Sequence, residues 1–157
     1  MKQRLYLETS IVSYLAARPA GDLVLAARQH ITWQWWEYRK SAFDVHISQA
    51  VVDEAGDGDP QAAMRRLTLL GGLPRLETSP AAVELGESLV QGGLLPRKAA
   101  TDALHVAVAT VHEMDLLLTW NCKHLANGEI VGALARAMRS RGFELPVICT
   151  PDELMGE

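Results

Sequence analysis

Three carboxylate side chains and one amide side chain lie in the sequence at positions where they could form a metal or catalytic site at one edge of a sheet. Glu8 directly follows the first short apolar run, and Asn121 directly follows the apolar run that begins at Asp115. Glu54 comes just after a second expected strand, and Asp102 lies near the start of a helical segment that leads to Asp115. Proteins with a parallel sheet bind ligands in the crevice outside the carboxyl ends of the strands. These side chains are expected to lie at that crevice and therefore to converge. Because grouped carboxylates repel one another and a hard cation such as Mg²⁺ or Mn²⁺ holds them together, the pattern predicts a metal site.

Asp102 is the most informative of these residues because its helix has almost no polar face. Residues 99–109 are apolar nearly all the way round, and Val106 and Ala109 share the side on which Asp102 lies. A helix without a wet face is buried on both sides, and an unpaired buried charge is costly. Asp102 is therefore expected to face a partner or a cation. The alternative is that its charge only complements the positive end of the helix.

Glu8 and Glu54 also have ordinary explanations. A charged residue often ends a strand, and Glu54 has a neighbour, Asp53, that could replace it in any acidic site. Either acid of that pair could also be a solvated helix residue. Only the expected convergence of Glu8, Glu54 and Asp102 at one crevice favours a functional interpretation.

The elements expected to position these residues alternate between strands and helices. Strands are predicted at Leu5–Leu7, Phe43–Ser48, Leu73–Thr78, Asp115–Trp120 and Pro146–Cys149. Helices are predicted from a cap at Thr9 or Ser10 to Leu15, from Asp22 to about Lys40, over Gln49–Ala55 and Pro60–Leu70, from Ser79 to Gly92, over Ala99–Met114 and over Glu129–Arg141. This alternation is typical of an α/β fold, a three-layer doubly wound parallel sheet with helices on both faces. No repeat or linker interrupts it, so residues 1–157 are expected to form a single domain.

Composition excludes several classes of protein. The 157 residues are 48% hydrophobic and 22% charged, which is incompatible with a disordered or fibrous chain. The net charge of −4 argues against a protein that coats DNA regardless of sequence. No apolar run approaches the roughly 20 residues that span a bilayer. The apolar stretch before Glu8 is too short for a signal peptide, so a cytoplasmic location without membrane association is expected. Cys122 and Cys149 lack the spacing of a zinc site and are expected to be reduced thiols.

Three segments of the chain resemble the PIN domain, and in particular the VapC-like toxins of bacterial toxin–antitoxin pairs. These segments are Tyr6–Ser10, Thr101–Ala107 and Leu117–Asn121, and the resemblance extends over nearly the whole chain. It implies a PIN-like fold and a ribonuclease that depends on Mg²⁺ or Mn²⁺. It further implies that Glu8, Glu54 and Asp102 bind the metal and that Asn121 takes the place of a fourth acid. The partners it implies are an RNA substrate and a small antitoxin protein, and it allows a homodimer.

Two positions depart from the usual pattern of that family. Glu8 stands where aspartate is usual and is one methylene longer, and Asn121 offers a neutral oxygen where aspartate is frequent. Both can still bind a hard cation, although a second metal would be held less well. The alternative function is therefore a catalytically weak PIN-fold module that binds RNA or a partner protein. A phospho-acceptor receiver domain is excluded, because the third and fifth expected strands end in Glu77-Thr78 and Thr150-Pro151 rather than in an aspartate and a lysine.

Three further side chains could support the carboxylates without binding metal themselves. Ser10 and Thr119 lie next to the predicted ligands, although helix capping and strand propensity explain them equally well. His105 lies one turn after Asp102 and could position that residue or approach a phosphate. The simpler interpretation of His105 is a packed, hydrogen-bonded core histidine.

Three tryptophans crowd one end of the long helix that Asp22 begins. Trp33, Trp35 and Trp36 are spread round the helix, so they cannot all face one core. At least one of them is expected to contact a partner protein.

Overall fold

A computed structural model describes residues 1–157, and five parallel strands form its central sheet in the order β3-β2-β1-β4-β5. The strands are β1 (Arg4–Leu7), β2 (Asp44–Ser48), β3 (Arg75–Leu76), β4 (Leu116–Leu118) and β5 (Val147–Cys149). The chain builds outward from β1 to β3 and then returns to place β4 on the other side of β1. Strand order therefore reverses between β1 and β4, and Leu7 pairs with Leu118 at the carboxyl ends of these two strands.

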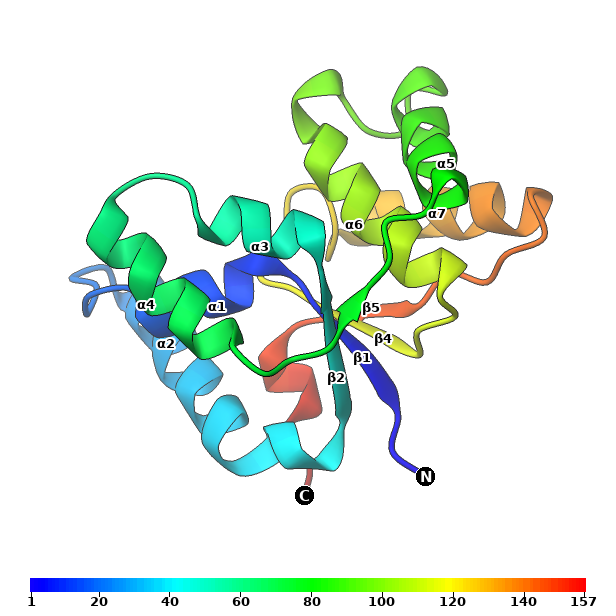
Figure 1. Cartoon of the computed structure of the whole chain (residues 1–157). Helices are drawn as coiled ribbons and strands as arrows, with labels where there is room; N and C mark the ends of the chain where they lie inside the picture. The colour runs from blue at the N-terminus through cyan, green and yellow to red at the C-terminus, as the bar shows by residue number, and fades with distance from the viewer.

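Seven α-helices cover the two faces of the sheet (Figure 1). They are α1 (Thr9–Ala16), α2 (Leu23–Gln34), α3 (Gln49–Ala55), α4 (Pro60–Leu70), α5 (Pro80–Gln91), α6 (Ala100–Val111) and α7 (Gly128–Ser140). In Figure 1, α1 to α4 lie on one side of the strands and α5 to α7 on the other. Right-handed crossovers require this division, because the direction of travel along the sheet changes after β3. The predicted three-layer doubly wound α/β fold is confirmed.

The two helical layers bury the middle of the sheet completely. Leu5, Tyr6 and Leu7 of β1 have no exposed surface, as expected for a central strand covered on both faces. Helix α6 packs against α5, and its residues from His105 to Thr110 are all buried. Its first turn is more open, and Asp102 in that turn is half-buried. The prediction of a helix buried on both sides therefore holds for α6 beyond its first turn.

Several element boundaries differ from the sequence-based expectation, and β4, predicted over Asp115–Trp120, is limited to Leu116–Leu118. Strand β3 is only two residues long, because it is an edge strand that pairs with β2 alone. The long helix is α-helical only to Gln34 and continues as a π-helical turn over Trp35–Arg39 and a 3₁₀ turn over Lys40–Ala42. The cap of α1 is Glu8 and not Thr9 or Ser10, because the Glu8 carboxylate accepts the Ser10 backbone N–H.

The predicted starts of α2, α4 and α5 are confirmed. Asp22 and Asp59 accept the backbone N–H groups of Leu25 and Ala62, each at 2.9 Å. Pro60 and Pro80 occupy the first position of α4 and α5, where the missing N–H costs no hydrogen bond. Both cysteines are free thiols. None of the helices combines the length and apolar character needed to cross a membrane.

Candidate metal centre

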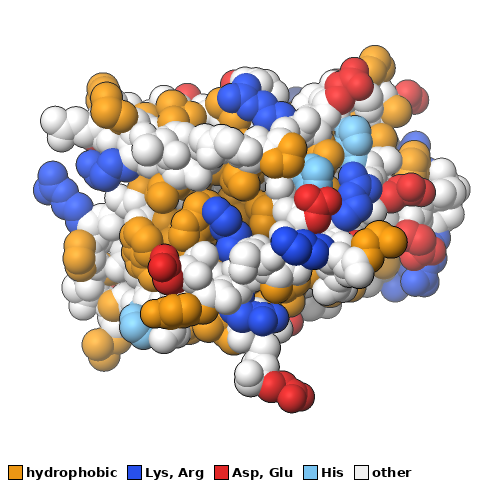
Figure 2. Space-filling view, turned by 60° about the horizontal axis from the view of Figure 1, so that its bottom comes forward, with side chains coloured by type: hydrophobic (Ala, Val, Ile, Leu, Met, Phe, Trp, Pro, Cys, Tyr) orange, Lys and Arg blue, Asp and Glu red, His pale blue; other side chains and the backbone are white.

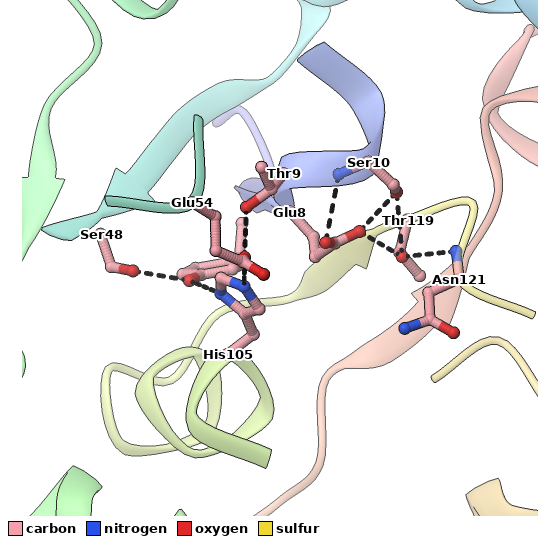
Figure 3. Close-up of polar contacts among 9 residues, drawn as sticks. Glu8, Thr9, Ser10, Ser48, Glu54, His105, Thr119 and Asn121 are labelled. Atoms are coloured by element: carbon pink, nitrogen blue, oxygen red, sulfur yellow. Dashed lines mark hydrogen bonds and ion pairs between the residues drawn. The ribbon is translucent and has the colours of Figure 1, made fainter. Parts of the chain in front are cut away.

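The candidate centre lies where strand order reverses, at the carboxyl ends of β1 and β4. The backbone N–H of Glu8 donates to the Leu118 carbonyl at 3.0 Å, which extends the pairing of the two strands by one residue. The chain then turns from β1 into α1, so the Glu8 side chain enters the site from the central strand (Figure 3). This is the position in a doubly wound sheet at which ligands bind.

Glu8 is held by hydrogen bonds to both of its carboxylate oxygens. Glu8 as a whole is only 4% exposed. The backbone N–H of Ser10 donates to Oε2 at 3.1 Å, and the Thr119 hydroxyl donates to Oε1 at 2.6 Å. The Ser10 hydroxyl also donates to Oε1. Ser10 and Thr119 thus contact the carboxylate that the sequence pattern placed beside them, and they fix its orientation.

Glu54 reaches the site from α3 and is held at one oxygen only. Its Oε1 accepts hydrogen bonds from the Thr9 hydroxyl at 2.7 Å and from Nε2 of His105 at 2.5 Å. Burial alone would raise the pKa of Glu54, but the contacts with His105 and Thr9 outweigh burial and lower the pKa. Glu54 is therefore ionised, and it lies opposite Glu8 across the site.

His105 is a fully buried histidine with a partner at each ring nitrogen. Its Nε2 donates to Glu54, and its Nδ1 lies 2.6 Å from the Tyr6 hydroxyl, which in turn lies 2.7 Å from the Ser48 hydroxyl. Burial would lower the pKa of His105, but the hydrogen bond to Glu54 and the charge of Glu8 outweigh burial and raise it. His105 is thus a packed, hydrogen-bonded histidine, and the acid that it contacts is Glu54 rather than Asp102.

Asp102 is half-buried in the first turn of α6. Burial raises its pKa, and the charge of Glu8 raises it further, while His105, Asn121 and His124 act in the opposite direction without cancelling the shift. The close group of potential ligand atoms, all within 4.8 Å of one another, comprises Glu8, Glu54 and His105 and does not include Asp102. Asp102 is therefore near enough to feel the charge of Glu8 but stands apart from the tightest cluster.

Asn121 has a different role in the structure from that of a free oxygen ligand. Its side-chain oxygen accepts the backbone N–H groups of Lys123 and His124, at 3.2 and 3.0 Å. The same side chain lowers the pKa of Asp102, as a nearby amide N–H does. Asn121 thus caps the turn after β4 with its oxygen and stabilises the negative charge of Asp102.

The donor set fits a hard divalent cation. Glu8 and Glu54 bring carboxylate oxygens close together, Asp102 lies near Glu8, and oxygen ligands of this kind suit Mg²⁺ or Mn²⁺. Burial and the charge of Glu8 raise the pKa of Asp102, and a cation beside it would stabilise its charged form. His105 is less suited than the carboxylates to bind the cation directly, because both of its ring nitrogens already have hydrogen-bond partners. Glu8, Glu54 and Asp102 are the residues that would hold the cation.

Three residues of this network were not singled out from the sequence, namely Thr9, Tyr6 and Ser48. In the sequence, Thr9 is a candidate helix cap, and Tyr6 and Ser48 lie in expected strands. The usable signal was the Tyr6 hydroxyl, since a tyrosine in a completely buried strand needs a hydrogen-bond partner. Its partners could not be named without the strand order, because they come from β2 and α6.

Comparisons with known proteins bear on the fold. No family model matches the sequence, and a comparison with curated proteins finds no match. Among solved structures, the chain is similar to a chain of VapBC2 from Rickettsia felis, which was crystallised bound to a DNA fragment from its promoter. The TM-score is 0.59, and the match covers 94% of this chain and 98% of that chain at 17% sequence identity. The chain therefore has a PIN-like α/β fold, as the sequence resemblance implied.

Proposed function

We propose that this protein is a ribonuclease that depends on Mg²⁺ or Mn²⁺ and serves as the toxin of a toxin–antitoxin pair. One observation supports the proposal: ligand atoms of Glu8 and Glu54 lie within 4.8 Å of each other, and Asp102 lies near enough for the charge of Glu8 to raise its pKa. The PIN-like fold and the sequence resemblance supply the substrate class, which is RNA. When bound, the cation would polarise a scissile phosphate and lower the pKa of an attacking water.

In this proposal each side chain of the site has a different role toward the cation. Glu8 is nearly inaccessible and is fixed by hydrogen bonds to Ser10 and Thr119, so it would be the least mobile ligand of the cation. Glu54 has a free oxygen and a lowered pKa, so it would stay ionised at neutral pH. Asp102 is half-buried and its pKa is raised, so its negative charge would be stabilised by a cation. Asn121 would keep the loop after β4 closed beside Asp102 rather than contribute a charge.

The test is cleavage of RNA by the purified protein with and without divalent metal. We expect cleavage with Mg²⁺ or Mn²⁺, none with EDTA, and loss of cleavage in Asp102→Asn. A matched control is Asp53→Asn, which changes the neighbouring acid on α3, whose carboxylate contacts Gln49 at the surface. Equal cleavage by the parent and a folded Asp102→Asn protein would contradict the proposal.

The alternative is a PIN-fold module that binds RNA or a partner protein without cleaving. Glu8 favours it, because its longer side chain has both oxygens occupied by Ser10 and Thr119. In that case the purified protein would bind RNA in a metal-independent manner and leave it intact. The same cleavage assay separates the two functions.

The proposed antitoxin has a candidate surface on α2 and α4. Large apolar side chains are exposed there, and a hollow of about 370 Å³ lies between these helices and α1. Its lining includes Trp33, Met64 and Arg65. Figure 2 shows hydrophobic side chains gathered on the half of the molecule that holds α1, α2 and α4 in Figure 1. Trp33 is 47% exposed, whereas Trp35 is fully buried and Trp36 is half-buried, so Trp33 is the tryptophan available to a partner.

A further inference from the structure

We propose that His105 is a positioning residue, which makes Glu54 present a single oxygen to the cation. The inference rests on the proposed metal site and adds a role that the three carboxylates do not show. On the side of Glu54 that faces the protein interior, Thr9 and His105 both donate hydrogen bonds to Oε1.

The hydrogen bonds of Glu54 are one-sided. Thr9 and His105 both donate to Oε1, and no hydrogen bond reaches Oε2. In Figure 3 the bonded oxygen lies between Thr9 and the imidazole, and the other oxygen carries no dashed line. A carboxylate with one oxygen saturated in this way binds a cation through the other, so Glu54 would be a monodentate ligand through Oε2.

The imidazole that holds Glu54 is itself fixed. His105 has no exposed surface, and the Tyr6 hydroxyl lies 2.6 Å from Nδ1. Tyr6 is also completely buried, and its hydroxyl meets the Ser48 hydroxyl at the end of β2. The ring therefore cannot turn to offer Nε2 elsewhere without breaking buried hydrogen bonds at both nitrogens, which is costly.

Packing alone does not explain this arrangement. An apolar side chain would fill a fully buried position on α6 without the cost of burying polar atoms. Instead, polar groups from β1, β2 and α6 form a continuous chain that ends at Glu54. Metal ligands are commonly oriented by hydrogen bonds of this kind, and loss of such a partner typically weakens metal affinity by roughly 10- to 100-fold.

The chain offers a matched pair of variants at this position. In His105→Gln the side-chain amide reaches as far as Nε2 and can still donate to Glu54. In His105→Asn the shorter amide reaches only as far as Nδ1, so it can contact Tyr6 but not Glu54. The probe is Mn²⁺ alone, with free Mn²⁺ measured by electron paramagnetic resonance during titration of the metal-free protein, and folding checked by circular dichroism and thermal melts.

We expect His105→Asn to weaken Mn²⁺ binding roughly 10- to 100-fold. The His105→Gln protein should stay within about threefold of the parent, which would also exclude His105 as a direct nitrogen ligand. In a Glu54→Gln background, His105→Asn should cause no further loss, because the histidine acts through Glu54. Equal Mn²⁺ affinity in the Asn and Gln variants, or a loss that persists in the Glu54→Gln background, would overturn the inference.

Two further results keep the test decisive. Should His105→Asn fail to fold, Tyr6→Phe replaces it, because Phe keeps the ring and removes only the hydroxyl beside Nδ1. A Tyr6→Phe protein with unchanged Mn²⁺ affinity would then overturn the inference. Failure of the parent protein to bind Mn²⁺ would instead overturn the proposed metal site itself, so the two failures are distinguishable.

Discussion

The side chains of Glu8 and Thr119 lie 111 positions apart in the chain and share a hydrogen bond of 2.6 Å at the junction of β1 and β4. The bond joins the first strand to the fourth at the point where strand order reverses. Thr119 also accepts the backbone N–H of Asn121 at 2.9 Å, so one hydroxyl links the deepest carboxylate of the site to the loop beside Asp102.

Removal of the Thr119 hydroxyl should lower Mn²⁺ affinity and have a modest effect on the free energy of unfolding. Thr119→Val keeps the shape of the side chain but leaves Glu8 with one donor fewer, and we expect Mn²⁺ affinity to fall roughly 10-fold. The free energy of unfolding should fall by about 1 to 2 kcal/mol, because a buried hydrogen bond to a charged group is lost. Titration with Mn²⁺ and urea denaturation measure the two effects. Thr119→Ser is the control, since it keeps the hydroxyl and should bind Mn²⁺ like the parent.

Asp102→Asn should have opposite effects on stability and on function. The pKa of Asp102 is raised in the folded protein, so the fold disfavours its charged form, and the metal-free protein loses stability as the pH rises above the ordinary pKa of 3.8. The neutral amide removes this cost, and the metal-free variant should melt at a higher temperature than the parent at pH 7. It should also lose most of the stabilisation by Mg²⁺ and reduce RNA cleavage on the order of 100-fold or more. A variant that melts lower than the parent in EDTA would show that Asp102 is well compensated without metal.

Much of this architecture could be predicted from the local sequence. Asp22, Pro60 and Pro80 indicate helix starts through chemistry that acts within one turn, and the structure confirms these starts. The length of β3 could not be predicted, because Leu73–Thr78 is a good strand by composition and only its edge position limits pairing to Arg75–Leu76.

In the site, too, local features can be predicted from the sequence and contacts between distant elements cannot. Local sequence is enough to propose Glu8 after the first strand and Glu54 and Asp102 on two helices as candidate ligands, and this assignment stays a prediction. Which donors hold them depends on contacts between distant elements, such as the bond from His105 to Glu54 across 51 positions. The spacing of His105 suggested Asp102 as its partner, because one helical turn separates them, but the buried ring faces α3 and β1 instead.

The contact between His105 and Glu54 predicts a particular pH dependence in the metal-free protein. The pKa of His105 is raised above its ordinary value of 6.5, so its contribution to stability is fully present below pH 6.5 and is lost as the pH rises through the raised value. The pKa of Glu54 is lowered, so its contribution is present above 4.5 and is lost as the pH falls through the lowered value.

Urea denaturation in EDTA between about pH 6 and 9 tests the alkaline side of this dependence. We expect the parent to lose stability as the pH rises, and His105→Gln to lose less, because an amide does not titrate. Parallel curves for the two proteins would mean that the proton on His105 contributes nothing to folding.

The tryptophans should separate into one interface residue and one core residue. Trp33→Ala should leave the melting temperature of the isolated protein nearly unchanged and weaken its complex with the proposed antitoxin by about 2 kcal/mol or more. Trp35→Ala should instead destabilise the isolated protein by about 3 to 5 kcal/mol, because Trp35 is completely buried against Phe43. Co-purification with a tagged partner and thermal melts of the isolated variants check both results. An unstable Trp33→Ala protein would assign this residue to the core as well.

Asn121→Asp tests how much charge the site tolerates without metal. The substitution changes shape very little, and one carboxylate oxygen can still accept the N–H groups of Lys123 and His124. It also replaces an amide that lowers the pKa of Asp102 with a fourth negative group. Repulsion should then raise the pKa of Asp102 further and lower the stability of the metal-free protein at pH 7.

Metal should reverse this penalty, since a cation relieves the repulsion that the fourth carboxylate adds. The Asn121→Asp protein should melt lower than the parent in EDTA, gain more stability from Mg²⁺, and reach half-maximal cleavage at a lower Mg²⁺ concentration. Asn127→Asp is the matched control, because Asn127 also caps a turn, at the start of α7, but donates to the Lys123 carbonyl away from the carboxylates. Should Asn121→Asp respond to EDTA and Mg²⁺ as Asn127→Asp does, the only role of Asn121 is to close the turn after β4, and the charge of Asp102 is set by Glu8 and burial alone.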